Sequence, residues 1–137
     1  MSNDAILLAN REDSLTHERP AMTPHTTRDT HPGRAALSGI RVIEIGTFLS
    51  APFAATLLAD FGADVLKIEL PNEGDPMRTL GAYPPEGDSG YWWSYIGRNK
   101  RSVALDVRTP EGREILGQLL ASADVLIENF RPGTLAR

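Results

Sequence analysis

Three polar side chains, Arg108, Asn129 and Arg131, follow short apolar runs in the second half of the 137-residue sequence. An arginine guanidinium is planar and makes paired, charged hydrogen bonds with phosphate oxygens. If the apolar runs are parallel strands, these side chains lie at the carboxyl ends of the strands, where α/β sheets collect ligands. We therefore expect them to contact a ligand that carries phosphate groups.

Two further segments lie beside apolar runs. The basic run 98–101 is interpreted either as part of a ligand site or as a solvated charge cluster, and the sequence favours neither. The segment 46–52 lacks the second and third glycines of the G-x-G-x-x-G fingerprint and is no Walker loop, which weakens a nicotinamide dinucleotide or ATP interpretation. A helix that begins there still offers free N–H groups to a phosphate or a pantetheine carbonyl.

The residue types argue against several catalytic chemistries. His17, His25 and His31 all lie in the first 36 residues, so no later serine has a histidine near it in sequence. No two of these histidines share a helical face, so no metal site is expected. The chain has no cysteine, which excludes disulfides, thiolate metal sites and a cysteine nucleophile. Turns, caps or surface positions explain five aspartates better than catalysis does: Asp64, Asp75, Asp88, Asp106 and Asp124.

The elements that must position these residues form two similar halves. Short runs rich in β-branched residues predict strands at 40–45, 63–69, 102–106 and 124–130, with a helix between the strands of each half. Each strand, helix, strand unit is a right-handed parallel βαβ motif, and two of them predict an open, mostly parallel α/β sheet. The segment 70–90 is expected to form a long loop, and the aromatic block 91–96 to cover an edge of the core.

Each predicted helix has a start signal and an apolar stripe. Ser50 and Pro52 mark the start of the first helix and Gly62 its end. Its stripe facing the sheet is expected to comprise Phe53, Leu57 and Phe61. Thr109 caps the second helix, at about 110–121, whose buried face is expected to comprise Ile115, Leu116, Leu119, Leu120 and Ala123.

Composition sets the remaining boundaries. Residues 1–36 contain none of the four Phe, two Trp and three Tyr, and they predict a disordered tail before one domain at 37–137. The net charge of −4 argues against a nucleic-acid partner. No apolar run approaches the roughly 20 residues that span a bilayer, and no export signal is visible, so no membrane contact and a cytoplasmic location are expected.

Five ordered blocks carry a family resemblance: L-S-G-I-R-V-I-E-I, A-P-F-A-A-T-L-L-A-D-F-G-A-D-V-L-K-I-E, G-D-P-M-R, N-K-R-S-V-A-L-D-V-R-T-P-E-G-R and A-D-V-L-I-E-N-F-R-P-G. In this order they resemble the N-terminal part of class III CoA-transferases, which include the formyl-CoA and carnitine CoA-transferases. The resemblance covers residues 37–137. It implies a Rossmann-like large domain with helices on both faces of the sheet, coenzyme A at the strand-end loops, and an interlocked homodimer.

The resemblance also implies a reaction and a set of contacts. Coenzyme A moves between an acyl-CoA and a carboxylic acid through an aspartate, which forms an anhydride and then an aspartyl-CoA thioester. Matched residue by residue, the family's coenzyme A contacts fall on Leu49, Ser50, Leu70, Leu105, Asp106, Val107, Arg108, Asn129, Phe130, Arg131 and Arg137. The sequence departs from some transferases at Leu49, where they have glutamine, and at Leu70, where they have arginine.

The family's nucleophilic aspartate and its small domain lie downstream of the N-F-R-P-G block. We therefore expect an incomplete large domain that contains no catalytic residue and is inactive as an isolated chain. Two alternatives stay open: an acyl-CoA racemase or dehydratase-type relative, which shares the fold, and a noncatalytic remnant that binds coenzyme A or a partner chain. The long segment 70–91 and the aromatic block before N-K-R-S look more like transferases.

Overall fold

The computed structural model describes residues 6–8, 35–87 and 89–135. Most of the predicted tail, residues 1–36, lies outside this part of the chain. Three of its residues form a strand, β1, to which the sequence analysis assigns no element. The elements in chain order are β1 (Ile6–Leu8), β2 (Arg41–Glu44), α1 (Ser50–Asp60), β3 (Asp64–Glu69), the short 3₁₀ helix η1 (Pro76–Thr79), α2 (Tyr91–Ile96), β4 (Lys100–Ala104), α3 (Pro110–Ala121) and β5 (Val125–Ile127).

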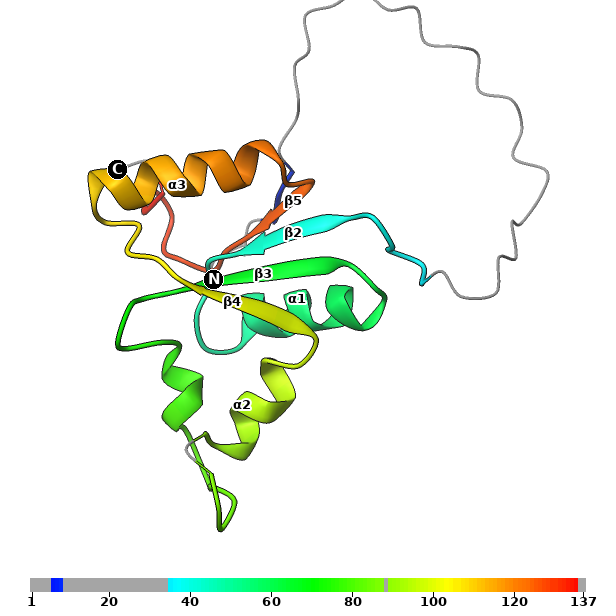
Figure 1. Ribbon diagram of the computed structural model, residues 1–137, viewed down its shortest axis with the longest axis vertical. Helices are drawn as coiled ribbons and strands as arrows, with labels where there is room; N and C mark the ends of the chain where they lie inside the picture. The colour runs from blue at the N-terminus through cyan, green and yellow to red at the C-terminus, as the bar shows by residue number, and fades with distance from the viewer. Residues whose placement is uncertain (1–5, 9–34, 88, 136–137) are drawn as a thin grey trace, which may run out of the picture.

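One sheet organises these elements, with strand order β1-β5-β2-β3-β4 (Figure 1). Strands β5, β2, β3 and β4 run parallel, and β1 pairs antiparallel with β5. The chain proceeds from β2 outward to β3 and β4, and then returns to place β5 on the other side of β2. This reversal confirms the predicted mostly parallel, Rossmann-like sheet and puts a topological switch point between β2 and β5.

Helices cover both faces of the sheet, as predicted (Figure 1). Neighbouring residues of β2 point to opposite faces, because side chains alternate along a strand. Val42 belongs to the core under α1, with Val65, Ile127, Ala51, Ala55 and Ala59. Ile43 belongs to the core under α3, with Leu66, Ile68, Leu126, Leu116, Leu119 and Leu120. The sheet is therefore the middle of three layers.

The buried face of α1 differs from the prediction. Phe53, Leu57 and Phe61 are exposed by 37%, 41% and 59%, and the residues against the sheet are small: Ala51, Ala55, Thr56 and Ala59. Both stripes have the same spacing of four residues, so periodicity does not distinguish them. The small stripe faces inward because it lets the helix backbone approach the sheet closely. A side chain at Gly46, after β2, would collide with the Ala51 Cβ and with Asn129.

The helix ends are partly as predicted. Helix α1 begins at Ser50, as predicted, but its N-cap is Leu49, which makes no side-chain capping bond, so the Ser50 hydroxyl does not cap the helix. Gly62 follows the helix with a φ of +95°, a conformation that suits a residue without Cβ. Helix α3 has the predicted bounds, and the Thr109 hydroxyl accepts a 3.0 Å hydrogen bond from the Gly112 amide. On its predicted buried face only Ile115 is exposed.

The aromatic block forms helix α2, and its packing is looser than predicted. Ile96 is fully buried, but Tyr91, Trp92 and Tyr95 are about half exposed. The Thr56 hydroxyl of α1 lies 2.5 Å from the Ile96 carbonyl oxygen, which fastens the end of α2. Across the described ranges, no helix combines the length and apolar character needed to cross a membrane.

Candidate functional site

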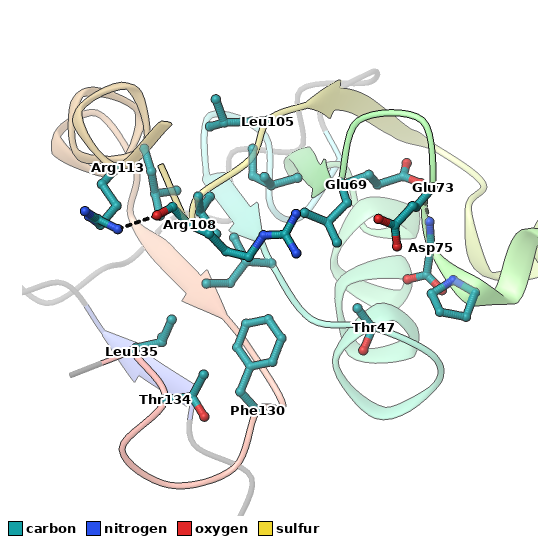
Figure 2. A pocket seen from close by; sticks show the side chains of 17 residues that line it. Thr47, Glu69, Glu73, Asp75, Leu105, Arg108, Arg113, Phe130, Thr134 and Leu135 are labelled. Atoms are coloured by element: carbon teal, nitrogen blue, oxygen red, sulfur yellow. Dashed lines mark hydrogen bonds between the residues drawn. The ribbon is translucent and has the colours of Figure 1, made fainter. Parts of the chain in front are cut away.

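A cavity of about 590 Å³ lies at the carboxyl ends of the parallel strands, between the loops that follow them and the start of α3 (Figure 2). We call it the strand-end cavity. Its interior is mainly apolar and is formed by Ile45, Ile68, Leu70, Leu105, Val107, Leu116, Phe130 and Leu135. Its polar lining comprises Thr47, Glu69, Glu73, Asp75, Arg108, Arg113 and Thr134. An apolar pocket with a few charged groups at its border suits a small ligand that has a ring and an anionic part.

The predicted site residues divide into two groups. Five of them line the strand-end cavity: Leu70, Leu105, Val107, Arg108 and Phe130. Five do not: Leu49, Ser50, Asp106, Asn129 and Arg131. Arg137 lies outside the described residues. The structure therefore brings together predicted contacts from three different strand ends, those of β3, β4 and β5.

The Arg108 side chain, which lines the cavity, forms an ion pair with Asp106. Its Nε and Nη2 donate 2.8 Å hydrogen bonds to the two carboxylate oxygens of Asp106, which itself does not line the cavity. The Arg108 side chain holds the pKa of Asp106 at about 2, and Asp106 raises the pKa of Arg108. Figure 2 shows the guanidinium extending from the α3 side toward the loop that carries Glu73. The cation is thus oriented at the cavity, and a phosphate would share it with Asp106.

Asn129 makes its hydrogen bonds within the chain. Its side-chain oxygen accepts a 3.0 Å hydrogen bond from the Thr47 amide, and its side-chain nitrogen donates to the Thr47 carbonyl oxygen at 2.8 Å. The same nitrogen donates to the Ser50 hydroxyl oxygen at 3.0 Å. The hydrogen bonds of Asn129 therefore connect the loop after β2 to the end of β5, across the switch point. The sequence predicted a polar residue at this strand end, but it does not reveal the hydrogen-bond partners of Asn129.

The Glu69 carboxylate is fully engaged at the end of β3. Arg78 donates to it at 2.7 and 2.9 Å, the Ser102 hydroxyl at 2.5 Å and the Asp75 amide at 2.8 Å. Burial raises the pKa of Glu69, but the hydrogen bonds from Arg78, Ser102 and the Asp75 amide outweigh it and lower this pKa to about 2. A carboxylate with this many donors fixes the loop and is a poor nucleophile.

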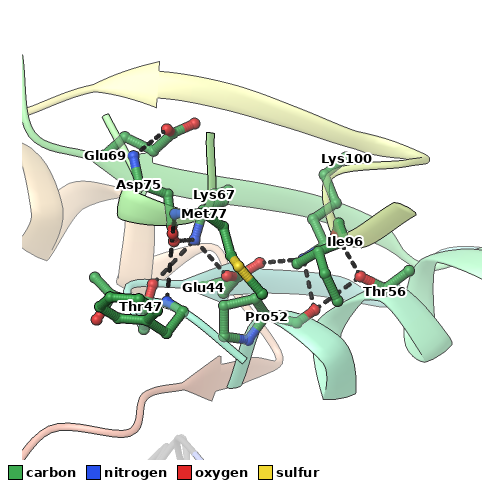
Figure 3. A network of polar contacts seen from close by, with 12 residues as sticks. Glu44, Thr47, Pro52, Thr56, Lys67, Glu69, Asp75, Met77, Ile96 and Lys100 are labelled. Carbon is green, nitrogen blue, oxygen red and sulfur yellow. Dashed lines mark hydrogen bonds and ion pairs between the residues drawn. The ribbon is translucent and has the colours of Figure 1, made fainter. Parts of the chain in front are cut away.

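A buried ion network lies beside the cavity (Figure 3). Glu44 on β2 is paired in register with Lys67 on β3, and Asp75 and Lys100 complete the group. The sequence analysis missed this network and interpreted Asp75 as a cap or turn residue. Asp75 is indeed the N-cap of η1, with its side chain accepting from the Met77 amide. The available signal was a Glu at the end of β2 and a Lys inside β3, each next to buried apolar residues.

The basic run 98–101 makes ion pairs within the chain. Arg98 pairs with Asp60 at 2.6 Å, Lys100 with Glu44 at 2.8 Å and Arg101 with Asp64 at 2.7 Å. The run leads into β4, which begins at Lys100, whereas the strand-end cavity lies beyond the other end of this strand. Neither of the two interpretations left open by the sequence describes it, because its cations are held by acidic side chains of α1, β2 and β3.

Other candidate sites are weaker. A hollow of about 500 Å³ against α2 is lined by Ala82, Tyr91, Trp92 and Tyr95, with no charged residue. In the described part of the chain, no three His, Asp or Glu side chains are grouped to hold a metal ion. The strand-end cavity is therefore the candidate site.

Comparison with known proteins identifies the family of the chain. Residues 37–137 match the sequence profile of CoA-transferase family III. The chain is 50% identical over 99 residues to succinyl-CoA–D-citramalate CoA-transferase of Chloroflexus aurantiacus, covering 72% of this chain and 24% of that protein. It is 44% identical over 102 residues to formyl-CoA:oxalate CoA-transferase of Afipia carboxidovorans, covering 74% of this chain and 24% of that protein.

A solved structure shows the same fold. The crystal structure of a CAIB/BAIF family protein from Brucella suis superposes with a TM-score of 0.69 at 42% identity, covering 75% of this chain and 28% of that one. The chain belongs to CoA-transferase family III. It spans about a quarter of the length of the curated relatives it matches.

Proposed function

We propose that the protein supplies the coenzyme A-binding part of a CoA-transferase, which moves coenzyme A between an acyl-CoA and a carboxylic acid. The observation that carries the proposal is the gathering of Leu70, Leu105, Val107, Arg108 and Phe130 around one cavity in a chain of this family. The apolar interior suits the adenine ring, and Arg108 suits a phosphate. Coenzyme A is the substrate here, and no metal is invoked.

We propose short acyl groups and small organic acids as the substrates. The relatives named above use succinyl-CoA with citramalate or formyl-CoA with oxalate, and another, 54% identical over 101 residues, is the beta subunit of a succinyl-CoA–L-malate CoA-transferase. These names support a donor acyl-CoA of one to four carbons and a carboxylate acceptor. The chain matches about a quarter of each of these proteins.

The covalent steps of the proposal use the aspartate that the family resemblance places downstream of the N-F-R-P-G block. Its carboxylate attacks the acyl-CoA thioester and forms an anhydride, releasing the coenzyme A thiolate. The thiolate then attacks the aspartyl carbonyl, which gives an aspartyl-CoA thioester and frees the donor acid. The acceptor carboxylate reverses these two steps. Glu69 and Asp75 are unsuitable for this role, because both carboxylates are buried and hydrogen-bonded.

We propose further that the working enzyme contains a second chain. Two relatives are named as the alpha and beta subunits of one transferase, and the family resemblance implies a homodimer. The exposed apolar outer face of α1 supports association.

A chimera tests the proposed function. Residues 37–137 replace the matching segment of the C. aurantiacus D-citramalate transferase, and transfer from succinyl-CoA to citramalate and malate is measured for the chimera and for the 137-residue chain alone. We expect transfer by the chimera, its loss by at least tenfold on Arg108→Ala because a charged hydrogen bond contributes roughly 1.5–3 kcal/mol, and none by the chain alone. Arg101→Ala is the matched control. A folded chimera that binds no coenzyme A, or enzyme-like turnover by the chain alone, would contradict the proposal.

A further inference from the structure

A buried group of four charges joins two loops beside the strand-end cavity (Figure 3). Lys67 Nζ lies 2.6 Å from one oxygen of Glu44 and 2.8 Å from Oδ2 of Asp75, and Lys100 Nζ lies 2.8 Å from the other Glu44 oxygen. None of the four side chains is more than 2% exposed. Two cations and two anions balance, which is what charges removed from water require.

Asp75 carries the connection between the loops. Its Oδ1 accepts a hydrogen bond from the Met77 amide at 2.8 Å, within its own turn, and one from the Phe48 amide at 3.3 Å, in the loop after β2. The ion-paired Lys67 donates a further hydrogen bond to the Gly46 carbonyl oxygen at 3.0 Å. The loop 46–49 is thus attached at two points to the network.

The attached loop has a conformation that needs support. Phe48 has a φ of +65°, in the left-handed region that side chains with a Cβ rarely adopt. The Phe48 amide is held by its hydrogen bond to Asp75, and the preceding residue, Thr47, is held by two hydrogen bonds with Asn129. Thr47 on this loop and Asp75 and Pro76 on the other loop both line the strand-end cavity. Movement of one loop relative to the other therefore changes the cavity.

We propose that Asp75 is a positioning residue for coenzyme A. Through the Phe48 amide and Lys67 it holds the loop after β2 against the turn after β3 and so fixes the part of the cavity between them. The identity of the ligand rests on the function proposed above. The network also contributes to the stability of the fold. The test must therefore distinguish an effect on the position of the loop from an effect on the free energy of unfolding.

Three variants of the 137-residue chain make this separation. Asp75→Ala removes both the charge and the acceptor. Asp75→Asn keeps an oxygen for the two amides and loses the charge that faces Lys67. Val65→Ala is the control for stability. It shortens a fully buried side chain of β3 under α1, away from the loops, and should lower the free energy of unfolding as the Asp75 variants do. Each is measured by thermal unfolding, by amide hydrogen exchange at Phe48 and by calorimetric titration with coenzyme A.

We expect Asp75→Ala to expose the Phe48 amide to exchange and to weaken coenzyme A binding by about tenfold, the effect of losing an interaction of roughly 1.4 kcal/mol. Val65→Ala keeps both properties near those of the wild type despite a lower melting temperature. Asp75→Asn gives values between those of the wild type and Asp75→Ala, because it keeps an oxygen for the two amides and loses the ion pair with Lys67. If Asp75→Ala does not fold, Asp75→Ser, whose shorter side chain still caps η1, replaces it.

Two results would overturn the proposal. One is unchanged hydrogen exchange of the Phe48 amide in Asp75→Ala or its substitute, and the other is a coenzyme A affinity that follows the melting temperature across all variants. A wild-type chain that binds no coenzyme A would overturn the proposed function, and Phe48 exchange would still decide whether Asp75 holds the loop.

Discussion

Arg108 and Asp106, two residues apart, form an ion pair at the border of the strand-end cavity that bears on the proposed binding of coenzyme A. Because the pKa of Asp106 is about 2, its carboxylate stays charged across the whole physiological range and keeps the guanidinium oriented. The same carboxylate accepts hydrogen bonds from Nε and Nη2 of Arg108, the two nitrogens that would donate to a phosphate. Asp106 therefore both orients Arg108 and competes with its ligand.

The competition gives a prediction for Asp106→Asn. Removing the negative charge leaves Arg108 available to phosphate, so coenzyme A affinity should rise roughly two- to fivefold, the range expected for an exposed ion pair. Asp64→Asn is the matched control, because it removes one carboxylate of an exposed ion pair with Arg101 at the other end of β3. Calorimetric titration measures both. Lower affinity in Asp106→Asn would show that orientation outweighs competition.

Glu69 gives a prediction for stability against pH. Its pKa is lowered from 4.5 to about 2 in the folded chain, so its contribution to stability is present above pH 4.5 and is lost as the pH falls toward 2. The free energy of unfolding should fall by roughly 2 kcal/mol more in the wild type than in Glu69→Gln between pH 5 and pH 2. Denaturant unfolding at several pH values provides the measurement. If the free energy of unfolding depended on pH in the same way in both chains, Glu69 would not contribute to the loss of stability in acid.

At the scale of elements, α1 shows what sequence periodicity decides and what it leaves open. Its extent was predictable from the start signals near Pro52 and the Gly62 end. Its buried face was not, because Phe53, Leu57, Phe61 and Ala51, Ala55, Ala59 have equal spacing, and hydrophobicity favours the larger set. Only the distance between helix and sheet, a tertiary property, selects the alanines. The predicted bounds of α3 were right because Thr109 and Pro110 give a local signal.

The inward alanine stripe predicts that a substitution on the inner face of α1 destabilises the chain more than one on its outer face. Ala55→Leu adds volume at a fully buried position against the sheet and should destabilise the chain by roughly 1–3 kcal/mol. Leu57→Ala removes a half-exposed side chain and should change stability by no more than about 0.5 kcal/mol. Chemical denaturation of both variants distinguishes the faces. A larger loss from Leu57→Ala would restore the orientation that the sequence predicted.

The candidate site was predictable in outline for a similar reason. Strand ends are local features, so the loops after β2, β3, β4 and β5, which border the cavity, followed from the strand predictions. The partners of their side chains were not local. Glu44 and Lys67 become neighbours only through the register of β2 and β3, and Asn129 meets Thr47 only because β5 lies beside β2.

At the scale of the whole molecule, the outer face of α1 leaves large apolar side chains in contact with water. Phe53 stacks on Tyr95 with ring centroids 6.4 Å apart, and both rings remain partly exposed, as do Leu57 and Phe61. Grouped apolar side chains at a surface favour association.

We expect the 137-residue chain to associate at tens of micromolar protein, and the double variant Phe53→Ser, Leu57→Ser to shift toward the monomer, since these positions contribute little to the chain's own core. Analytical ultracentrifugation over a concentration series gives the result. The control is Ile115→Ser, which makes the same kind of change at an exposed position of α3. A wild-type chain that stays monomeric would show that this face needs no partner.

The central claim is that the strand-end cavity binds coenzyme A through Arg108, and one titration tests it most directly. Coenzyme A is titrated into the wild-type chain, Arg108→Ala and Arg101→Ala at low and physiological salt. We predict binding by the wild type that weakens as salt rises, because charged contacts at a partly exposed site are screened over about 8 Å at physiological ionic strength. Arg108→Ala should bind roughly tenfold or more weakly, since a hydrogen bond to a charged group contributes roughly 1.5–3 kcal/mol, and Arg101→Ala should bind like the wild type. Equal affinity in all three chains, or no binding by the wild type, would contradict the account.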